Sequence, residues 1–512
     1  MTRPYLLVAL CASAAALLVP AAQQPLHRIE SQIPIGKPTH EGDDATSFVN
    51  SVSLQERVKI GNLWKRAEKL YEIAKKGEEE YGHPTRVIGS KGHLATIEYI
   101  KSELAALKGY YNVSEQSFGA VSGSVHEFRL TIGSTVPNTT STMGLTPPTV
   151  DKEPVFGDLI LVKNSGCEKS DYPAAVDGNI AFVKRGECSF GAKSFLAGKA
   201  GARAAVIYNT DPEEIHGTLG TPSKHHVATF GLGGKEGSEY AELLLRGKVF
   251  SASAYIDADV NTIKTHNVIA QSTTGDANNC VMLGGHSDSV PEGPGINDDG
   301  SGSLSVLEVA VQLSHYRIKN CVRFAWWSAE EEGLLGSDHY VASLSEEENN
   351  KVRLFMDYDM MASPNFAYQV YNATDDTSPP GSEALRDLYI NWYKDNGLNY
   401  TLIAFDGRSD YDGFIRGGIP AGGIATGAEG VKTKEEEELF GGKAGEWYDK
   451  NYHQLGDDLS NLNLTAWEVN TKLIAHSVAT YAASFKGFPK RSKQASIQEL
   501  PKWKYHGNKL IM

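Results

Sequence analysis

The chain has 512 residues, of which 41% are hydrophobic and 22% are charged, so it can bury large hydrophobic cores. Length alone predicts about three domains. The formal net charge of -14 argues against nucleic acids and anionic membranes as partners, because both attract basic surfaces.

The N-terminal residues have the layout of a cleaved secretory signal. A basic residue precedes an apolar run over residues 5–19, and small residues follow it. The run is too short to span a membrane, and the polar tail at 490–512 shows no lipid-anchor signal. We therefore expect a signal peptide at 1–22, a propeptide or disordered arm at 23–47, and a secreted, extracellular protein. A vacuolar destination is the alternative.

A helical stretch comes next, and a β-rich stretch follows it. Over residues 54–107 apolar residues recur at spacings of three and four, as on the buried face of a helix. Over residues 148–258 the sequence changes to short β-like runs at 159–162, 180–183 and 204–208, with an Ala/Gly-rich helix before the last. This change of pattern predicts a domain inserted into another.

Strands that alternate with helices begin again near residue 262. The strand-like runs lie at 267–270, 281–283, 322–327 and 352–356, and the helical segments at 302–316 and 464–485. Such alternation predicts an α/β fold with a mostly parallel sheet flanked by helices on both faces.

The most informative segment is GGHSDSVPEGPGINDDGSG, residues 284–302. It places His286, Asp288 and Asp298 after a predicted strand. A His-x-Asp triplet alone is weak evidence for a metal site, because most histidines in such settings lie on the surface or have partners in the core. The ends of the later strands add the other ligand types.

Carboxylates and a second histidine follow those later strands. Glu330 and Glu331 come after the third run, Asp359 comes after the fourth, and His453 lies in a polar loop. Ligands bind outside the carboxyl ends of parallel strands, so these groups are expected to converge. Two cations about 3.5 to 4 Å apart need a bridging carboxylate plus a histidine and a carboxylate each. One further carboxylate must take the proton of the water between them.

These motifs resemble peptidase family M28, the co-catalytic zinc exopeptidases, and within it the secreted fungal leucine aminopeptidases of the aminopeptidase Y type. The resemblance covers nearly the whole mature chain. It includes GRSDYDGF at 407–414 and GGIATGAE at 422–429, which are similar to the pocket loops of the family. It implies a zinc-exopeptidase fold of the phosphorylase/hydrolase-like type. It also implies an aminopeptidase with two zinc ions that acts on peptides with a free N-terminus and prefers leucine and other apolar residues.

The resemblance implies the metal ligands position by position. One zinc ion would be held by His286 and Asp359. The other would be held by Glu331 and His453. Asp298 would bridge the two ions.

The resemblance also implies three roles outside the ligand set. Glu330 falls on the general base. Asp288 falls on a carboxylate that orients His286, which agrees with the need to fix the ring of a metal-bound imidazole. Tyr452 matches a tyrosine that helps to stabilise the tetrahedral intermediate, and its alternative role is that of a packed aromatic with a solvated hydroxyl.

Some positions depart from the family pattern. Asp299 stands where asparagine is usual after the predicted bridge, and Asp357 stands where asparagine is common two residues before a predicted ligand. Glu332 replaces an apolar residue. Asn451 and Gly456 flank the predicted histidine ligand where bacterial relatives have a disulfide. That loop must therefore be fixed differently in this chain.

The inserted segment resembles a protease-associated domain through GNIAFVKRGECSFGAK at 178–193. The expected boundaries are 148–261 for this β-rich domain, and 48–147 and 262–489 for the zinc peptidase domain. The insert either restricts access to the cleft or stabilises the fold.

Four cysteines remain after the signal peptide is removed, and in an oxidising compartment they allow three pairings. We predict that Cys167 pairs with Cys188 inside the inserted domain. Cys280 and Cys321, at the starts of two strands, would form the second pair. Export also makes five N-x-S/T sequons candidate glycan sites. These sequons lie at Asn112, Asn138, Asn372, Asn399 and Asn463.

Two other functions compete with a monomeric secreted aminopeptidase. A related zinc exopeptidase of the carboxypeptidase type should offer cations for a free carboxylate, and the single Arg408 in a pocket-like loop does not decide the matter. A non-catalytic receptor-like ectodomain is expected to lose metal ligands, whereas all five ligand positions and the base are filled here.

Overall fold

The computed structural model describes residues 47–212, 215, 217–374 and 378–491. The predicted signal peptide at 1–22, nearly all of the arm at 23–47 and nearly all of the tail at 490–512 lie outside the described residues. Among the described residues, no helix has the length and apolarity needed to cross a membrane.

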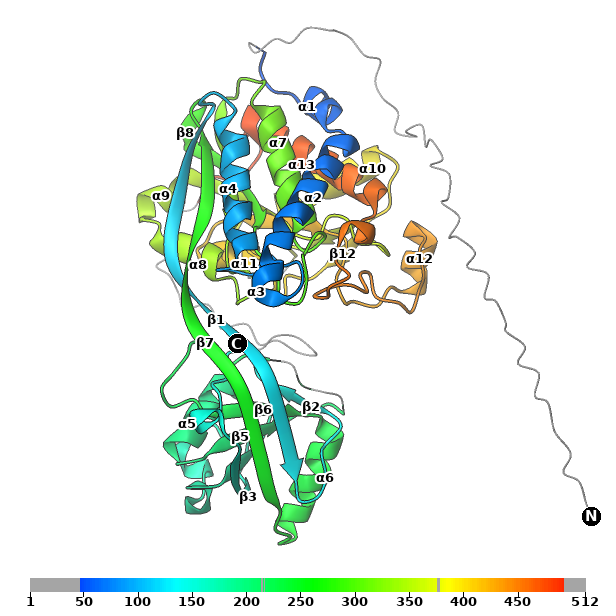
Figure 1. Cartoon of the computed structure of the whole chain (residues 1–512). Coiled ribbons are helices and arrows are strands. Elements are labelled where there is room, and N and C mark those ends of the chain that lie inside the picture. The colour runs from blue at the N-terminus through cyan, green and yellow to red at the C-terminus, as the bar shows by residue number, and fades with distance from the viewer. Residues whose placement is uncertain (1–46, 213–214, 216, 375–377, 492–512) are drawn as a thin grey trace, which may run out of the picture. The chain divides into compact units, whose positions relative to one another are not determined.

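The predicted ligands lie on a mixed, mostly parallel sheet in the order β12-β11-β13-β10-β8-β9-β7 (Figure 1). Its strands are β7 (Ser251–Ser272), β8 (Asp276–His286), β9 (Asn320–Trp327), β10 (Val352–Tyr358), β11 (Gln369–Tyr371), β12 (Thr401–Ile403) and β13 (Ala421–Ala425). β8 is parallel to β9 and β10, and β10 is parallel to β13. β7 is antiparallel to β9, and β11 is antiparallel to β13.

Helices pack on both faces of this sheet because its central strands are buried on both sides. Phe324 and Trp326 of β9 pack in one apolar cluster, whereas Ala325 and Trp327 pack in another, as the alternation of side chains along a strand requires. The helices are α1 (Ser51–Arg57), α2 (Ile60–Ala74), α3 (Glu78–Tyr81), α4 (Lys91–Ala105), α7 (Gly300–Leu313), α8 (Leu335–Ser343), α9 (Glu346–Lys351), α10 (Ser382–Asp395), α11 (Tyr411–Arg416), α12 (Lys434–Phe440) and α13 (Leu464–Ala483). The predicted α/β class is confirmed.

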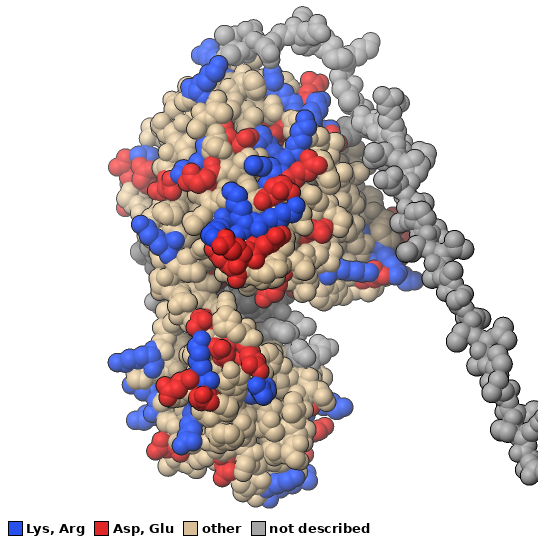
Figure 2. All heavy atoms as spheres, in the orientation of Figure 1, with Lys and Arg blue, Asp and Glu red and all other residues tan. Residues whose placement is uncertain are grey.

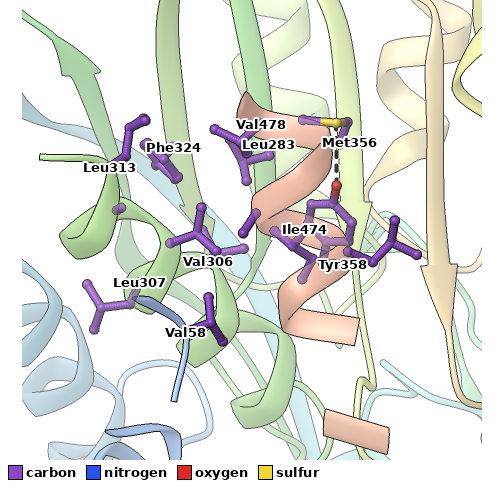
Figure 3. Packing of buried hydrophobic residues seen from close by; sticks show 14 of the residues in the cluster. Val58, Leu283, Val306, Leu307, Leu313, Phe324, Met356, Tyr358, Ile474 and Val478 are labelled. Atoms are coloured by element: carbon purple, nitrogen blue, oxygen red, sulfur yellow. Dashed lines mark hydrogen bonds between the residues drawn. The ribbon is translucent and has the colours of Figure 1, made fainter. Parts of the chain in front are cut away.

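The larger cluster joins α7 and α13 to the sheet. Val306 of α7 and Ile474 of α13 are fully buried and pack in one cluster with Phe324 and Met356 of the strands (Figure 3). Each such side chain stabilises the fold by about 1.5 to 3 kcal/mol through its burial. This packing fixes the strand ends that carry the predicted ligands.

The strands of the inserted segment continue the sheet beyond β7, and the segment has its own cores. It contains β2 (Thr140–Thr142), β3 (Val155–Leu161), β4 (Ile180–Lys184), β5 (Ala204–Tyr208), β6 (Ala228–Leu232), α5 (Phe190–Lys199) and α6 (Gly234–Leu245). β3, β4, β5 and β6 are parallel neighbours, and β2 pairs with β6 in the antiparallel sense. β3 also pairs with the first residues of β7.

Some residues before position 148 pack with the insert. β1 (Tyr111–Ile132) pairs with β7 over its whole length. Leu130 and Ile132, near its end, pack in the same cluster as β4 and β5. Met143 packs in the second core of the insert. The expected boundary at residue 148 places these residues in the peptidase domain, although their side chains pack with the insert.

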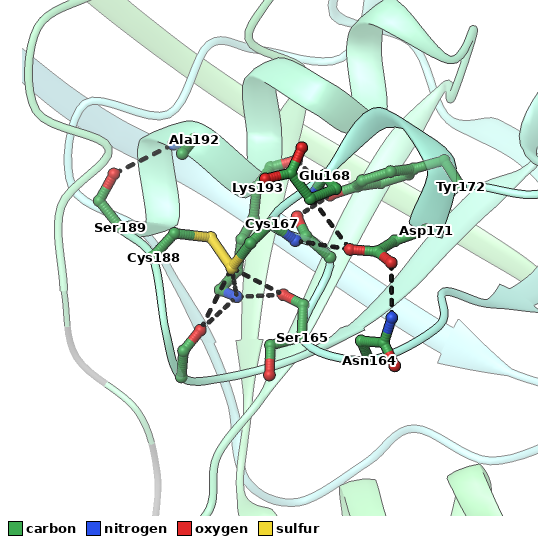
Figure 4. Close-up of a disulfide and its surroundings, with 12 residues drawn as sticks. Asn164, Ser165, Cys167, Glu168, Asp171, Tyr172, Cys188, Ser189, Ala192 and Lys193 are labelled. Carbon is green, nitrogen blue, oxygen red and sulfur yellow. Dashed lines mark hydrogen bonds between the residues drawn. A yellow bond between two sulfur atoms is a disulfide. The ribbon is translucent and has the colours of Figure 1, made fainter.

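Cys167 is joined to Cys188, and Cys280 is joined to Cys321, which is the predicted pairing. Around the first disulfide, Asp171 accepts hydrogen bonds from the backbone N–H of Cys167 at 3.1 Å, and the buried Lys193 ammonium donates to the carbonyl of Gly186 at 2.8 Å (Figure 4). The insert therefore has a cross-linked and internally hydrogen-bonded loop.

Charged side chains of both signs are mixed on the face of the molecule shown in Figure 2. Among the described residues, ion pairs at the surface include Lys101 with Glu98 at 2.8 Å and Lys152 with Asp257 at 2.7 Å. Exposed pairs of this kind contribute at most about 1 kcal/mol each. Buried charges, which water does not screen, are the better candidates for function.

Candidate metal centre and active site

Neighbouring strand ends bring the predicted ligands to one edge of the sheet. His286 is the last residue of β8, and Asp359 follows β10 directly. Glu330 and Glu331 lie just beyond the end of β9. Because β8, β9 and β10 are parallel neighbours, their carboxyl ends lie side by side.

Asp298 lies between the two histidines. Its Oδ1 is 3.2 Å from His286 Nε2, and its Oδ2 is 3.2 Å from His453 Nε2. His453 Nε2 also lies 3.1 Å from Glu331 Oε2, and His286 Nε2 lies 3.8 Å from Asp359 Oδ1. Two groups of three ligand atoms result, and Asp298 belongs to both.

Unpaired polar atoms show that this donor set suits a pair of cations. Glu331 Oε1 and Asp359 Oδ1 are buried and have no hydrogen-bond partner. Such atoms are expensive to bury unless something binds them. Imidazole nitrogens and carboxylate oxygens that point at common positions are the ligands that zinc takes in proteins. The two imidazoles and three carboxylates therefore fit two zinc ions.

The pKa values of these groups are strongly shifted. Burial raises the pKa of Glu330 well above its ordinary value and raises the pKa of Asp359 to about 7. Burial lowers the pKa of both histidines, but the neighbouring carboxylates outweigh it and hold the pKa of His286 and His453 well above 6.5. Without a metal, the site thus retains protons that a cation must displace.

Glu330 stands beside both ligand groups. Its Oε2 lies 3.9 Å from His286 Nε2, farther than the nearest oxygens of Asp298 and Asp359. Together with His286 and Glu331 it forms a third group, whose ligand atoms all lie within 4.8 Å of one another, close enough to share a metal ion. Distance alone is therefore compatible with Glu330 as a ligand as well as a base.

Asp288 lies beside His286, and its role in orienting the imidazole stays a prediction. Its Oδ1 is 3.8 Å from His286 Nδ1, which has no hydrogen-bond partner. The same carboxylate accepts hydrogen bonds from the backbone N–H groups of Glu330 and Glu331, each at 3.4 Å. Asp288 thus contacts the segment after β9 as well as the imidazole.

Asp299, the acid next to the predicted bridge, faces backbone amides. It is the N-cap of α7 and accepts from the N–H of Gly302 at 2.9 Å. It also accepts from the N–H of His286 at 3.1 Å and of Met360 at 3.0 Å. The two adjacent acids therefore point at different partners, and only Asp298 faces the imidazoles.

The other two extra acids also have neighbours outside the ligand groups. Asp357 Oδ2 accepts from the backbone N–H of Tyr411 at 3.3 Å. Glu332 accepts from the hydroxyl of Ser122 on β1 at 3.2 Å. By contrast, Asp359 belongs to a ligand group. Its Oδ2 accepts a hydrogen bond from the Ser409 hydroxyl, and its Oδ1 faces the imidazole of His286.

Tyr452 stacks on His453 with ring centroids 3.8 Å apart. Arg408 donates to its hydroxyl oxygen at 3.1 Å and binds Glu429 with both guanidinium nitrogens, at 2.8 and 3.1 Å. Burial raises the pKa of Tyr452 well above 10, so its hydroxyl stays protonated. The sequence placed Arg408 and Glu429 in pocket loops but gave no sign that they pair.

A cavity of about 410 Å³ opens beside these residues. Asp298, Glu330, Glu331, Asp359 and Tyr452 line it on the metal side. Much of the remaining wall is apolar. It includes Met360, Tyr371, Ile403, Ala404 and Ala425.

Arg86 was missed by sequence reasoning. It is fully buried, and its guanidinium donates to the carbonyls of Ser287, Pro294 and Gly295 in the loop between His286 and Asp298. An isolated arginine in the segment before α4 carries no pattern that indicates this contact.

Residues 267–478 match the family described as Peptidase family M28, and residues 155–240 match the PA domain. Aminopeptidase Y of Saccharomyces cerevisiae is 50% identical over 91% of this chain and 87% of its own length. Leucine aminopeptidase 2 of Trichophyton equinum is 45% identical over 87% of this chain and 89% of its own length.

Solved structures show the same fold. An aminopeptidase from Aneurinibacillus sp. strain AM-1 is 26% identical, with a TM-score of 0.70 over 87% of this chain and 98% of its own. BSAP, a zinc aminopeptidase from Bacillus subtilis, is 23% identical, with a TM-score of 0.57 over 83% of this chain and 97% of its own. The chain therefore belongs to peptidase family M28, and its insert is a PA domain.

Proposed function

We propose that this chain is a zinc-dependent aminopeptidase that releases N-terminal residues, leucine and other apolar residues among them, from peptides. The observation that carries the proposal is the position of Asp298, which offers one oxygen to each of two histidines. Its relatives named as aminopeptidases, at 50% and 45% identity, support the activity. The apolar wall of the cavity supports the preference for apolar residues.

Two zinc ions are proposed, one held by His286 and Asp359, the other by Glu331 and His453, with Asp298 shared between them. When bound, such a pair polarises the scissile carbonyl and makes a shared water acidic near neutral pH.

Two side chains of the cavity are proposed to act on the substrate. Glu330 takes a proton from the attacking water and returns it to the leaving amine, and its raised pKa suits a group that must both accept and donate. Tyr452 donates its hydroxyl proton to the developing oxyanion, because Arg408 already donates to its oxygen and leaves the O–H free to donate.

The same geometry disfavours the carboxypeptidase alternative. Arg408 is the cation of the pocket loop, and both of its terminal nitrogens are engaged by Glu429. The metal side of the cavity is lined by carboxylates, which attract the ammonium of a free N-terminus rather than a C-terminal carboxylate. The filled ligand set likewise argues against a receptor-like ectodomain.

We further propose secretion, a monomeric state and a PA domain that starts near residue 125, where β1 joins the core of the insert. Asn112, Asn138 and Asn399 are exposed, as glycan attachment requires. Asn463 instead caps α13, with its Oδ1 accepting from the N–H of Ala466 at 3.1 Å. The role of Asn372 as a glycan site remains a prediction.

Amino-acid amides test the proposed activity, because their only charged end is the amine. We expect the purified protein to hydrolyse leucine amide, to leave N-acetyl-leucine amide intact, and to contain two zinc ions per chain by elemental analysis. Release of C-terminal residues from N-blocked peptides, with no reaction on the free amides, would establish the carboxypeptidase alternative instead.

Zinc affinity is expected to rise as the pH increases through about 7. In the metal-free protein burial holds the pKa of Asp359 at about 7, so below that pH the carboxyl is protonated and zinc must displace the proton. The raised pKa values of the two histidines act in the same direction. Competition against a chelator of known zinc affinity at pH 6 and pH 8 measures this, and equal affinity at both values would contradict it.

A further inference from the structure

A buried network of four amide and carboxylate side chains lies behind the metal centre. Its members are Asn297, Asp449, Asp457 and Asn461, and none is more than 2% exposed. Asn461 Nδ2 donates to Asp449 Oδ2 at 2.8 Å and to Asp457 Oδ1 at 3.0 Å. Asn297 Nδ2 donates to Asp449 Oδ2 at 2.7 Å. We call these four residues the Asn/Asp network.

The Asn/Asp network holds the backbone of two proposed ligands. The Asp457 carboxylate accepts from the backbone N–H of Asn297 at 2.8 Å and of Asp298 at 3.0 Å. The side-chain oxygen of Asn297 accepts from the N–H of Ala362 at 3.1 Å, in the segment that follows Asp359. The positions of Asp298 and Asp359 are therefore both tied to the network.

The same network closes the loop of His453. Asp449 lies before this histidine and Asp457 lies after it, so the network joins the two ends of the loop. Within the loop, Asn451 Nδ2 donates to Asn461 Oδ1 at 2.8 Å. A Cβ on Gly456 would come within 2.4 Å of Asn451 Oδ1, so only glycine leaves room for this side chain.

His453 has a backbone conformation that needs such support. Its φ is 57°, in the left-handed region that side chains other than glycine avoid. A residue held there is strained by about 1 to 3 kcal/mol and persists only where its surroundings fix it. Hydrogen bonds at both ends of the loop provide that constraint.

We propose that the Asn/Asp network is the positioning device of the metal centre, which brings Asp298 and His453 to the same zinc ion. None of its four members lines the cavity, so the network acts through the ligands and not on the substrate. The inference rests on the proposed two-zinc function and adds to it the residues that fix the ligand geometry.

Asp457→Asn tests the inference, because it preserves the size of the side chain but replaces one carboxylate oxygen with an NH₂ group. That group cannot accept a hydrogen bond, so the backbone N–H of Asn297 or of Asp298 loses its acceptor. Asp458→Asn is the matched control. The Asp458 side chain accepts from the N–H and the hydroxyl of Ser460 in the neighbouring turn, and an asparagine oxygen can still accept there. We expect Asp457→Asn to weaken zinc binding by about 10- to 100-fold, the usual effect of losing an outer hydrogen bond to a ligand. Asp458→Asn should bind zinc like the wild type.

Zinc affinity is to be measured on folded protein, by chelator competition well below the melting temperature of the metal-free chain. A purely structural role would lower that melting temperature and leave the affinity of the folded protein unchanged, and this result would overturn the inference. If Asp457→Asn does not fold, Asn451→Ala is the second variant. It removes one half-buried side chain and with it the hydrogen bond from the His453 loop to Asn461 of the network. Wild-type zinc affinity in Asn451→Ala would then overturn the inference. A wild-type chain that binds no zinc would overturn the proposed function itself.

Discussion

Glu330→Gln should lower kcat by about 10² to 10⁴-fold while the protein keeps both zinc ions. The substitution preserves size and polarity but removes the group that accepts the proton of the attacking water. Glu330 lines the cavity with its Oε2 3.9 Å from His286 Nε2, and because this distance suits a ligand as well as a base, the zinc content of the variant decides between the two roles. Steady-state kinetics together with elemental analysis of the purified variant measure both quantities.

Two adjacent substitutions serve as controls for this result. Glu331→Gln should lose zinc, because it removes a charged ligand 3.1 Å from His453 Nε2. Glu332→Gln should keep zinc and activity near the wild-type level. Glu332 lies outside the ligand groups and accepts a hydrogen bond from the Ser122 hydroxyl, which the carbonyl oxygen of glutamine can also accept. Loss of a metal in Glu330→Gln, with both metals kept in Glu331→Gln, would reverse the two roles.

The sheet could be predicted because its central strands are apolar and end in polar, chemically distinctive residues. β8, β9 and β10 each stand out as a buried run, and parallel neighbours place their carboxyl ends together. The convergence of His286 and Asp359 follows from strand order alone. The family resemblance then supplied the roles that geometry could not.

β1 could not be predicted, and the reason is physical. Its 22 residues are mostly exposed or half-buried, so the sequence lacks the alternation of apolar and polar residues that marks a strand on a core. The strand is held by backbone pairing with β7 along its whole length. The first residue of the insert stays a prediction, since β1 has Tyr111 in the core of the peptidase domain and Leu130 in a core of the insert.

The Asn/Asp network escaped prediction for a different reason. Asparagine, aspartate and glycine in the segment after Tyr448 are typical of a solvated turn. Their burial depends on partners such as Asn297, which is 152 residues from Asp449 in the chain. A pattern within one segment cannot show that its amides are paired with another segment.

Asp298→Asn should remove at least one zinc ion per chain and lower kcat/KM by more than about 100-fold. Losing an outer hydrogen bond to a ligand costs up to about 100-fold, and losing a ligand itself should cost more. The wild-type carboxylate offers one oxygen to each histidine, whereas an asparagine has a single oxygen and no charge and cannot bridge two cations. Elemental analysis and kinetics on leucine amide measure the two effects.

Asp299→Asn is the matched control, because it makes the same change one residue away. Asp299 accepts from three backbone N–H groups, and an amide NH₂ placed among those donors leaves one of them unsatisfied, at about 1 to 3 kcal/mol of stability. This variant should therefore melt at a lower temperature. With the Asp298 carboxylate intact it should still bind two zinc ions at saturating zinc, with an affinity lowered by no more than the roughly 10- to 100-fold that losing an outer hydrogen bond to a ligand costs. If Asp299→Asn loses zinc while Asp298→Asn keeps both ions, the bridging carboxylate is Asp299. The position assigned to the bridge in the sequence is then wrong by one residue.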